Sequence, residues 1–206
     1  SRKDSMRAKR AGAHGPSLDP SYRQRLKERY GSDPLLDANL GRLQVSTIDG
    51  DTDGDGDLDE LTAFGTRSFS IWDAATGTLV YDSGNTLQRY VRAHHPKAFN
   101  MNRGVAARYD TRSDNRGGEV EAITSGRMGN RTLVFVAAER QNMIFAFDVT
   151  NPRKPSLEDA LFTLPAGHDS PESLRYIPGA SRKDGRSLLV AAFEGSETLA
   201  ILEVRP

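Results

Sequence analysis

The chain has 206 residues, of which 36% are hydrophobic and 27% charged, enough for one domain or a large part of one. Lys plus Arg and Asp plus Glu both number 28. The resulting zero net charge gives no global field that favours nucleic acid, so we expect no specific nucleic-acid partner. The absence of cysteine excludes disulfides, thiolate zinc sites and cysteine nucleophiles. No apolar run is long enough to span a bilayer, so we expect no transmembrane segment.

The first forty residues differ in pattern from the rest. Residues 1–20 are rich in basic residues, contain glycine and proline, and show no hydrophobic period, which predicts a linker. A short helix is predicted over 21–30, ending near Gly31. We therefore predict that residues 1–40 form a basic linker with one short helix.

From residue 43 onward the pattern is strand-like, because runs of branched and aromatic residues alternate with Gly, Pro, Asn and Asp. No long helical period interrupts these runs. The class is therefore all-β, with antiparallel neighbours joined by short loops. The predicted strands are 43–48, 61–65, 68–73, 78–82, 120–125, 132–139, 143–149, 160–164, 172–177, 187–194 and 198–204.

The strand runs repeat along the chain. Glu139 recurs as Glu194 and Asp148 as Glu203, both after 55 residues. Units of four short strands repeating at about fifty residues are typical of propeller blades. The sequence therefore predicts a partial β-propeller over 41–206, with about three four-stranded blades of a larger propeller. The predicted parts are a calcium-loop blade 42–82, a long insertion 84–118, a blade 119–164 and an incomplete blade 172–206.

Three blades cannot close a propeller, for which four to eight are typical, and an open arc would expose sheet edges. We therefore expect blades outside this sequence, and the remaining blades of the same propeller are an expected partner. A β-sandwich built from the same hairpins stays open as an alternative.

The strongest chemical signal is the segment 48–61, IDGDTDGDGDLDEL, in which aspartates alternate with small residues. Crowded carboxylates repel one another unless a cation neutralises them, and calcium prefers many oxygen ligands in flexible geometry. Glycines within the segment permit the backbone angles that a tight loop needs. The expected cofactor is Ca²⁺, and the predicted metal ligands are Asp51, Asp53, Asp55, Asp57 and Asp59.

Two registers of this loop compete. From Asp51, side chains alternate toward one centre, Asp57 contributes its backbone carbonyl and Asp59 closes the site. From Asp49, Glu60 falls at position 12, which resembles an EF-hand loop. Strands rather than helices are expected on both sides, which favours the register from Asp51. A solvated acidic turn that binds nothing is the alternative to both.

A second polar group is expected where strands enter the blades. Glutamates recur at equivalent strand starts and could face one pocket with an arginine, binding metal, phosphate or a sugar. Inter-blade salt bridges explain the same residues equally well. Common hydrolase and nucleotide motifs are missing, but scattered ligands of a metal-assisted phosphoesterase are not excluded. The candidate catalytic residues are Glu119, Glu121, Arg140 and Glu172.

Several segments resemble one known family in the right order: 41–73, TLVYDSG at 78–84, 112–123, LVFVAAER at 133–140, IFAFDVTNP at 144–152 and 169–178. They are similar to choice-of-anchor I proteins, exported bacterial β-propeller proteins, some of which are described as alkaline phosphatase-like. The resemblance covers about 41–204 and implies a larger propeller, an extracellular location and a variable C-terminal anchor. The chain departs from the pattern at Gly117-Gly118-Glu119, where family members usually have Gly-Pro-Glu. The family carries no well-defined activity.

Two functions follow as hypotheses. The first is a calcium-binding β-propeller module that is secreted or on the cell surface and serves a binding or structural role. The second is a metal-dependent, alkaline phosphatase-like phosphoesterase with a Glu and Arg site at the mouth of the propeller channel. A phosphorylated or carbohydrate ligand suits either, and the residues leave open whether the chain is an enzyme.

Overall fold

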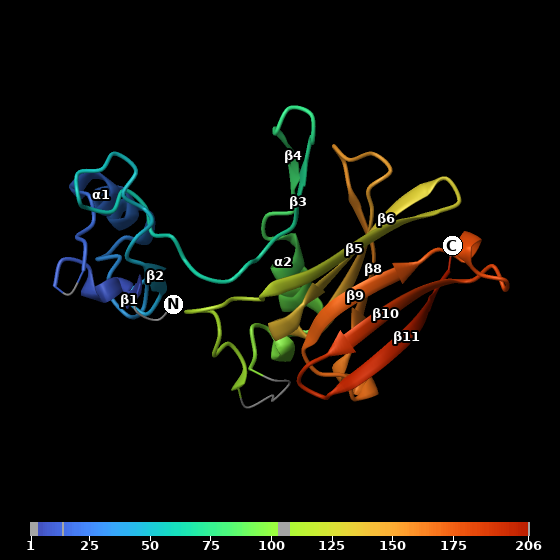
Figure 1. Ribbon diagram of the computed structural model, residues 1–206. Helices are drawn as coiled ribbons and strands as arrows, with labels where there is room; N and C mark the ends of the chain where they lie inside the picture. Colours follow the sequence, from blue (N-terminus) through green and yellow to red (C-terminus); the bar gives the residue numbers. More distant parts are fainter. Residues whose placement is uncertain (1–3, 14, 103–107, 206) are drawn as a thin grey trace. The chain divides into compact units, whose positions relative to one another are not determined.

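The computed structural model describes residues 4–13, 15–102 and 108–205. Part of the expected linker and residues 103–107 of the expected insertion lie outside the described residues. The chain divides into two compact units, the first of residues 1–65 with 113–117 and the second of 66–112 with 118–206. Each unit is described by itself (Figure 1).

The first unit contains helix α1 (Pro20–Tyr30), which agrees with the helix predicted over 21–30. Asp19 caps its start, because a side-chain oxygen accepts a hydrogen bond of 2.7 Å from the backbone N–H of Tyr22. Proline at the first helical position is compatible with this start. Gly31 ends the helix in the left-handed conformation, with φ of 67°.

Strands β1 (Ser5–Arg7) and β2 (Gln44–Ser46) form an antiparallel pair in the first unit. Ala8, which begins the 3-10 helix η2 (Ala8–Arg10), is completely buried. The prediction of a linker over 1–20 is therefore wrong for the described part of that stretch. Its apolar residues are too few and too unevenly spaced to show a period. The core of this unit consists of Met6, Ala8, Leu18, Leu26, Val45 and Leu58.

The second unit contains two larger antiparallel sheets. The first has four strands in chain order, β5 (Val120–Met128), β6 (Arg131–Ala138), β7 (Met143–Asp148) and β8 (Ser156–Phe162). The second has three strands, β9 (Pro171–Ile177), β10 (Ser187–Phe193) and β11 (Thr198–Val204), with β10 in the centre. Both groups of strands agree with the strands predicted for the second and third repeats.

The expected first blade over 42–82 is not one sheet among the described residues. Strand β2 pairs with β1, whereas β3 (Ser70–Trp72) and β4 (Leu79–Asp82) form a two-stranded sheet in the second unit. The run 61–65 contributes only a single bridge, between Ala63 and Val45. The aspartate-rich loop and the glycines after it supply too little apolar alternation for a continuous sheet. The chain is mostly β, and no sheet closes on itself in the described structure.

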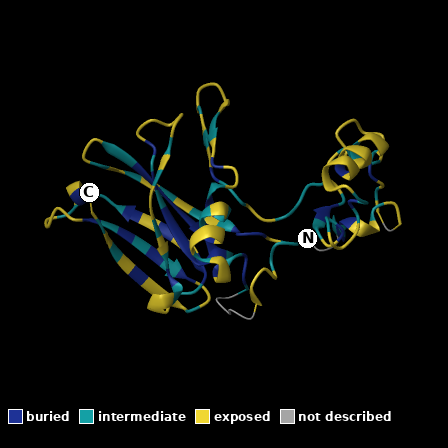
Figure 2. Ribbon diagram, turned by 180° about the vertical axis from the view of Figure 1, so that it is seen from behind, coloured by how far each residue is buried: buried dark blue, intermediate teal, exposed yellow. Residues whose placement is uncertain are grey.

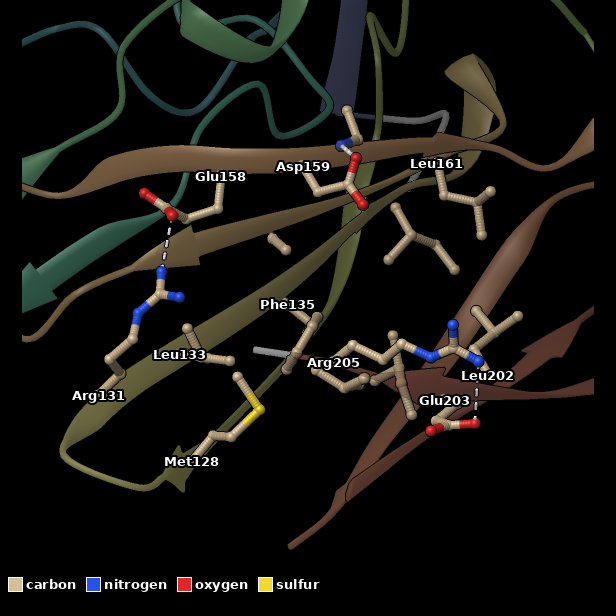
Figure 3. Close-up of a pocket in the computed structure, with 15 residues that line it drawn as sticks. Met128, Arg131, Leu133, Phe135, Glu158, Asp159, Leu161, Leu202, Glu203 and Arg205 are labelled. Atoms are coloured by element: carbon tan, nitrogen blue, oxygen red, sulfur yellow. Dashed lines mark hydrogen bonds and ion pairs between the residues drawn. The ribbon is translucent and has the colours of Figure 1, made fainter. Parts of the chain in front are cut away.

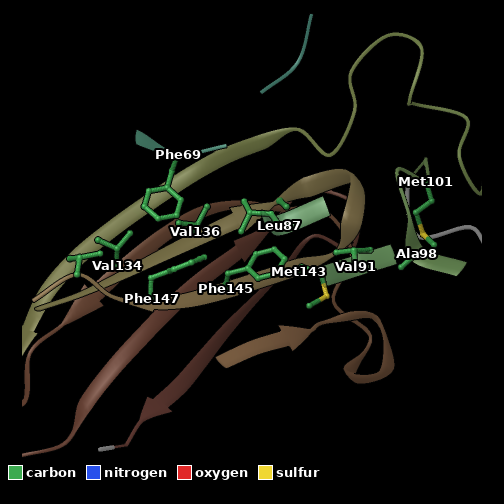
Figure 4. Close-up of a cluster of buried hydrophobic side chains, with 12 residues drawn as sticks. Phe69, Leu87, Val91, Ala98, Met101, Val134, Val136, Met143, Phe145 and Phe147 are labelled. Carbon is green, nitrogen blue, oxygen red and sulfur yellow. The ribbon is translucent and has the colours of Figure 1, made fainter. Parts of the chain in front are cut away.

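The expected insertion contains a helix that the sequence analysis missed. Helix α2 (Thr86–His94) buries Leu87 and Val91, four residues apart on one face, and the 3-10 helix η3 (Pro96–Ala98) follows it. These two side chains pack with one face of β6 and β7 in the largest apolar cluster (Figure 4). Phe147 meets Phe69 edge-on in this cluster, with ring centroids 4.9 Å apart.

The opposite face of β6 packs against the three-stranded sheet. Leu133, Phe135 and Ala137 point to this side, and Phe135 stacks on Tyr176 of β9 at 5.5 Å between centroids. Gly126 of β5 leaves room for the Tyr176 ring, which a Cβ at that position would overlap. Burial of both faces makes β6 and β7 the centre of the second unit (Figure 2).

Candidate metal centres

The aspartate-rich segment is a closed loop in the first unit. The carbonyl oxygen of Gly50 accepts hydrogen bonds from the backbone N–H groups of Asp59, at 2.8 Å, and Glu60, at 3.1 Å. Gly50 has φ of 104°, and a Cβ there would overlap the carbonyl oxygen of Glu60. The buried side chain of Leu58, 1% exposed, holds the far end of the loop in the core.

Within this loop the carboxylates organise the backbone. Asp51 accepts hydrogen bonds from the N–H groups of Gly54, at 2.7 Å, and Gly56, at 3.0 Å. Both glycines adopt positive φ, of 83° and 97°. Asp59 accepts hydrogen bonds from the hydroxyl and the N–H of Thr52, which lower its pKa. The alternation of aspartate and glycine therefore folds the loop back on itself, as the sequence suggested.

The structure brings together most of the predicted calcium ligands. Carboxylate oxygens of Asp51, Asp53 and Asp59 lie within 4.8 Å of one another. Carboxylate oxygens of Asp19, Asp57 and Asp59 form a second cluster within the same distance. Asp55 belongs to neither group. Asp19 was missing from the prediction because its position before α1 marks it as a helix cap.

Asp57 is placed differently from its neighbours. Its Oδ1 atom is buried and accepts no hydrogen bond. Desolvation, together with the nearby carboxylate of Asp55, raises its pKa. A buried carboxylate oxygen with no donor is costly, so this atom needs a proton or a cation.

The geometry also bears on the two registers of the loop. Asp49 accepts a 2.7 Å hydrogen bond from the hydroxyl of Ser46, outside both carboxylate groups. Glu60 is exposed and also lies outside them. The arrangement therefore favours the register that begins at Asp51 over the EF-hand-like register.

A second acidic cluster lies in the second unit, and we call it the glutamate cluster. Its carboxylates form two groups, each within 4.8 Å, that share Glu139. One group adds Glu119 and Glu121, and the other adds Glu172 and Glu194. The three predicted glutamates thus lie around one side chain that the prediction omitted. Their 55-residue repeat was the available sequence signal for Glu139 and Glu194.

Arg140 is an ion-pair partner in this cluster. Its Nε donates a 2.7 Å hydrogen bond to Glu119 Oε2, and its Nη1 lies 2.6 Å from Glu139 Oε1. The side chains of all three residues are buried, with 11%, 6% and 2% exposed for Arg140, Glu119 and Glu139. Salt bridges are therefore present on the buried side of the cluster, but they lie within one sheet and are not the inter-blade salt bridges expected from the sequence.

Burial governs the ionisation of the cluster. The pKa of Glu139 is raised to about 8. Desolvation is the largest cause, Arg140 opposes it in part, and the carboxylates of Glu121 and Glu119 act in the same direction as desolvation. Desolvation, followed by the charge of Glu119, also raises the pKa of Glu121. Without a cation, Glu139 therefore keeps its proton below about pH 8.

These features define a β-sheet protein with two acidic centres, one in a local loop and one assembled by the sheets. The model of the Choice-of-anchor I domain matches residues 1–152, and the chain belongs to this family. The family resemblance seen in 41–204 is thereby confirmed, although the match begins earlier and ends before β8. None of the described helices is both long and apolar enough to cross a membrane.

Two curated proteins are similar to this chain. Gigasin-3a of Magallana gigas is 30% identical over 188 residues, which cover 82% of this chain and 66% of Gigasin-3a. The mesenchyme-specific cell surface glycoprotein of Strongylocentrotus purpuratus is 28% identical over 180 residues, covering 74% of this chain and 22% of the glycoprotein. The chain thus spans just under two thirds of the first relative and about a fifth of the second.

Proposed function

We propose that this chain is a binding or structural module of an extracellular or cell-surface protein, and that its aspartate loop holds Ca²⁺. Membership of the Choice-of-anchor I family and the similarity to a cell surface glycoprotein support the location. The observation that carries the calcium proposal is the convergence of Asp51, Asp53 and Asp59 on a loop closed through Gly50.

The chemistry of this loop suits calcium. All the converging donors are carboxylate oxygens, which hard cations prefer, and calcium accepts such ligands in flexible geometry. Asp51, Asp53 and Asp59 supply side chains, and the rest of the predicted set, Asp55 and Asp57, follow within the same loop. The carboxylate of Asp19 lies in the same cluster as those of Asp57 and Asp59. The ion therefore also stabilises the start of α1 against the loop.

Equilibrium dialysis of the full chain against Ca²⁺ tests this function. We expect an Asp51→Asn, Asp53→Asn double variant to bind one calcium ion fewer than the natural chain. Asp49→Asn serves as the matched control, because Asp49 lies outside both carboxylate groups. No bound calcium at millimolar supply, or equal binding by the double variant, would exclude the loop as a calcium site.

We also propose that further sheets of the same repeat, the expected remaining blades, cover the three-stranded sheet. Leu133, Phe135 and Ala137 of β6 form the face that packs on β9–β11. The residues 55 positions later, which hold the equivalent face of β10, are Leu188, Val190 and Ala192. On the neighbouring strand, Leu199 and Ile201 are 61% and 63% exposed. Apolar exposure of this kind is typical of a surface that packs against another element.

The edge of this sheet supports the same proposal. Strand β7 is paired by β8, but its counterpart β11 pairs only with β10 in the described structure. A separate groove of about 350 Å³ is lined by apolar residues such as Leu161 and Leu202 and by charged residues such as Arg205, and it does not include Leu199 or Ile201 (Figure 3). If the face of Leu199 and Ile201 is an open docking surface, it should bind an apolar dye. We expect Leu199→Lys with Ile201→Lys to abolish that binding, and unchanged binding would contradict the proposal.

A metal-dependent phosphoesterase is the second candidate function, and the glutamate cluster is what favours it. The pairing of Arg140 with two glutamates argues against it as a free phosphate ligand in this arrangement. Turnover of p-nitrophenyl phosphate with calcium, lost in Glu121→Gln and kept in Asp53→Asn, would support the enzyme. No turnover of phosphomonoesters or diesters would favour the binding module.

A further inference from the structure

We propose that Glu139, Glu172 and Glu194 bind a second Ca²⁺ ion, separate from the aspartate loop and held between the two large sheets of the second unit. One carboxylate oxygen from each residue lies within 4.8 Å of the others. The proposal rests on where these carboxylates come from, on the buried oxygen of Glu139, and on the chemistry of the donor set.

The ligands come from both sheets. Glu139 follows β6, Glu172 lies in β9 and Glu194 follows β10. Backbone hydrogen bonds fix two of these positions, since Glu139 N–H donates to the carbonyl of Glu119 at 2.8 Å and Glu194 N–H donates to the carbonyl of Ser170 at 3.0 Å. An ion bound here would therefore connect two sheets at the ends of their central strands.

Glu139 provides an observation independent of the acidic character of the cluster. Its side chain is 2% exposed, and its Oε1 atom is buried without accepting a hydrogen bond. Arg140 Nη1 is near this oxygen at 2.6 Å but lacks the alignment of a hydrogen bond. Leaving such an atom without a hydrogen bond is costly, and a cation would satisfy it. Because Arg140 also pairs with Glu119, it cannot compensate the whole cluster.

The rim of the site is open. Glu172 and Glu194 are exposed, so an ion can reach the buried Glu139 from solvent. Neither of these two glutamates has an ion pair in the described structure, which leaves their charge available to a cation. The site thus combines one buried ligand with two that solvent can reach. A salt bridge with Arg140 does not require the two exposed glutamates.

The donor set selects the type of cation. Three carboxylate oxygens lie within 4.8 Å of one another and come from separate strand ends. Calcium accepts such oxygen ligands in flexible geometry, whereas magnesium demands near-ideal octahedral geometry and keeps several waters. The set contains only oxygen donors, which does not favour the softer transition metals.

The experiment first substitutes metal ligands in the aspartate loop and then adds substitutions in the glutamate cluster. In the full chain carrying Asp51→Asn and Asp53→Asn, calcium titration followed by calorimetry should still show one bound ion. Adding Glu172→Gln and Glu194→Gln should weaken that binding at least tenfold. These two side chains are exposed, so the fold should survive, which circular dichroism checks. Glu203→Gln in β11 is the matched control, since Glu203 lies outside the cluster.

The outcomes separate this proposal from the calcium loop. If the loop variant binds no calcium, or if the glutamate substitutions leave its affinity unchanged, the second site is refuted. If the glutamate substitutions remove one ion while the loop substitutions remove none, the second site stands and the loop proposal fails. Amide exchange adds a structural readout, because the ion should protect β6 and β9 together from exchange.

Discussion

Glu139 should give the protein a pH dependence opposite to that of an ordinary surface carboxyl group. Burial raises its pKa from 4.5 to about 8, so without metal the folded chain keeps a proton that the unfolded chain releases. A raised pKa means that the contribution to stability is complete below pH 4.5 and is lost as pH rises toward 8. Stability of the second unit should therefore fall across this interval in the presence of a chelator.

The size of the effect follows from the shift. At about 1.4 kcal/mol per pKa unit, the difference between 4.5 and about 8 corresponds to roughly 5 kcal/mol at most. Glu139→Gln keeps the shape of the protonated side chain and removes its titration. We expect the variant to lose much of the pH dependence and to be more stable than the natural chain at pH 9. Glu121, whose pKa burial also raises, leaves a residual slope.

Urea unfolding in EDTA at pH 5 and pH 9, followed by circular dichroism, measures this difference. The natural chain should lose a few kcal/mol more than Glu139→Gln between the two pH values. Glu158→Gln is the control, since Glu158 pairs with Arg131 at the surface and not with the cluster. An identical pH dependence in the natural chain and in Glu139→Gln would refute the assignment of a buried, protonated Glu139.

Three further outcomes are expected. Phe145→Ala should destabilise the second unit by about 3–5 kcal/mol in urea unfolding, because the side chain is fully buried. Leu199→Ala, at an exposed position, should change the stability by under about 0.5 kcal/mol. Similar values for the two variants would contradict the assignment of Phe145 to the core. Gly50→Ala should weaken calcium binding more than Gly54→Ala in dialysis, since only at Gly50 would a Cβ overlap another backbone atom. Hydrogen bonds from Thr150 and Arg131 hold the pKa of Asp148 at about 2, so its contribution is present above pH 4 and lost toward pH 2, and Asp148→Asn should flatten acid unfolding between those values.

The sequence was most informative where a pattern is local. The strands β5–β7 and β9–β11 were predicted within a few residues because their apolar runs end at turn residues. The aspartate loop was visible because its carboxylates are neighbours in the chain. Helix α2 was missed because Leu87 and Val91 are its only buried side chains, too few to reveal a helical period.

The parts that were missed depend on contacts between distant residues. The pairing of β1 with β2 buries Met6 opposite Val45, and nothing near Met6 in the sequence indicates that partner. Asp19 joins the carboxylates of the loop only because the start of α1 lies beside Leu58, whose carbonyl accepts the N–H of Asp19 at 3.0 Å. A residue can thus be a helix cap by sequence and a candidate ligand by structure.

The two acidic centres should affect stability in different ways. An ion in the aspartate loop connects residues of that loop with the start of α1 through Asp19, so it orders only part of the first unit. An ion between Glu139 and Glu194 connects positions 55 residues apart and requires both sheets to be folded. A ligand that binds only the folded state stabilises it in proportion to the logarithm of its concentration above Kd. Calcium at the glutamate cluster should therefore stabilise the contact between the sheets, whereas calcium in the loop should leave that contact unchanged.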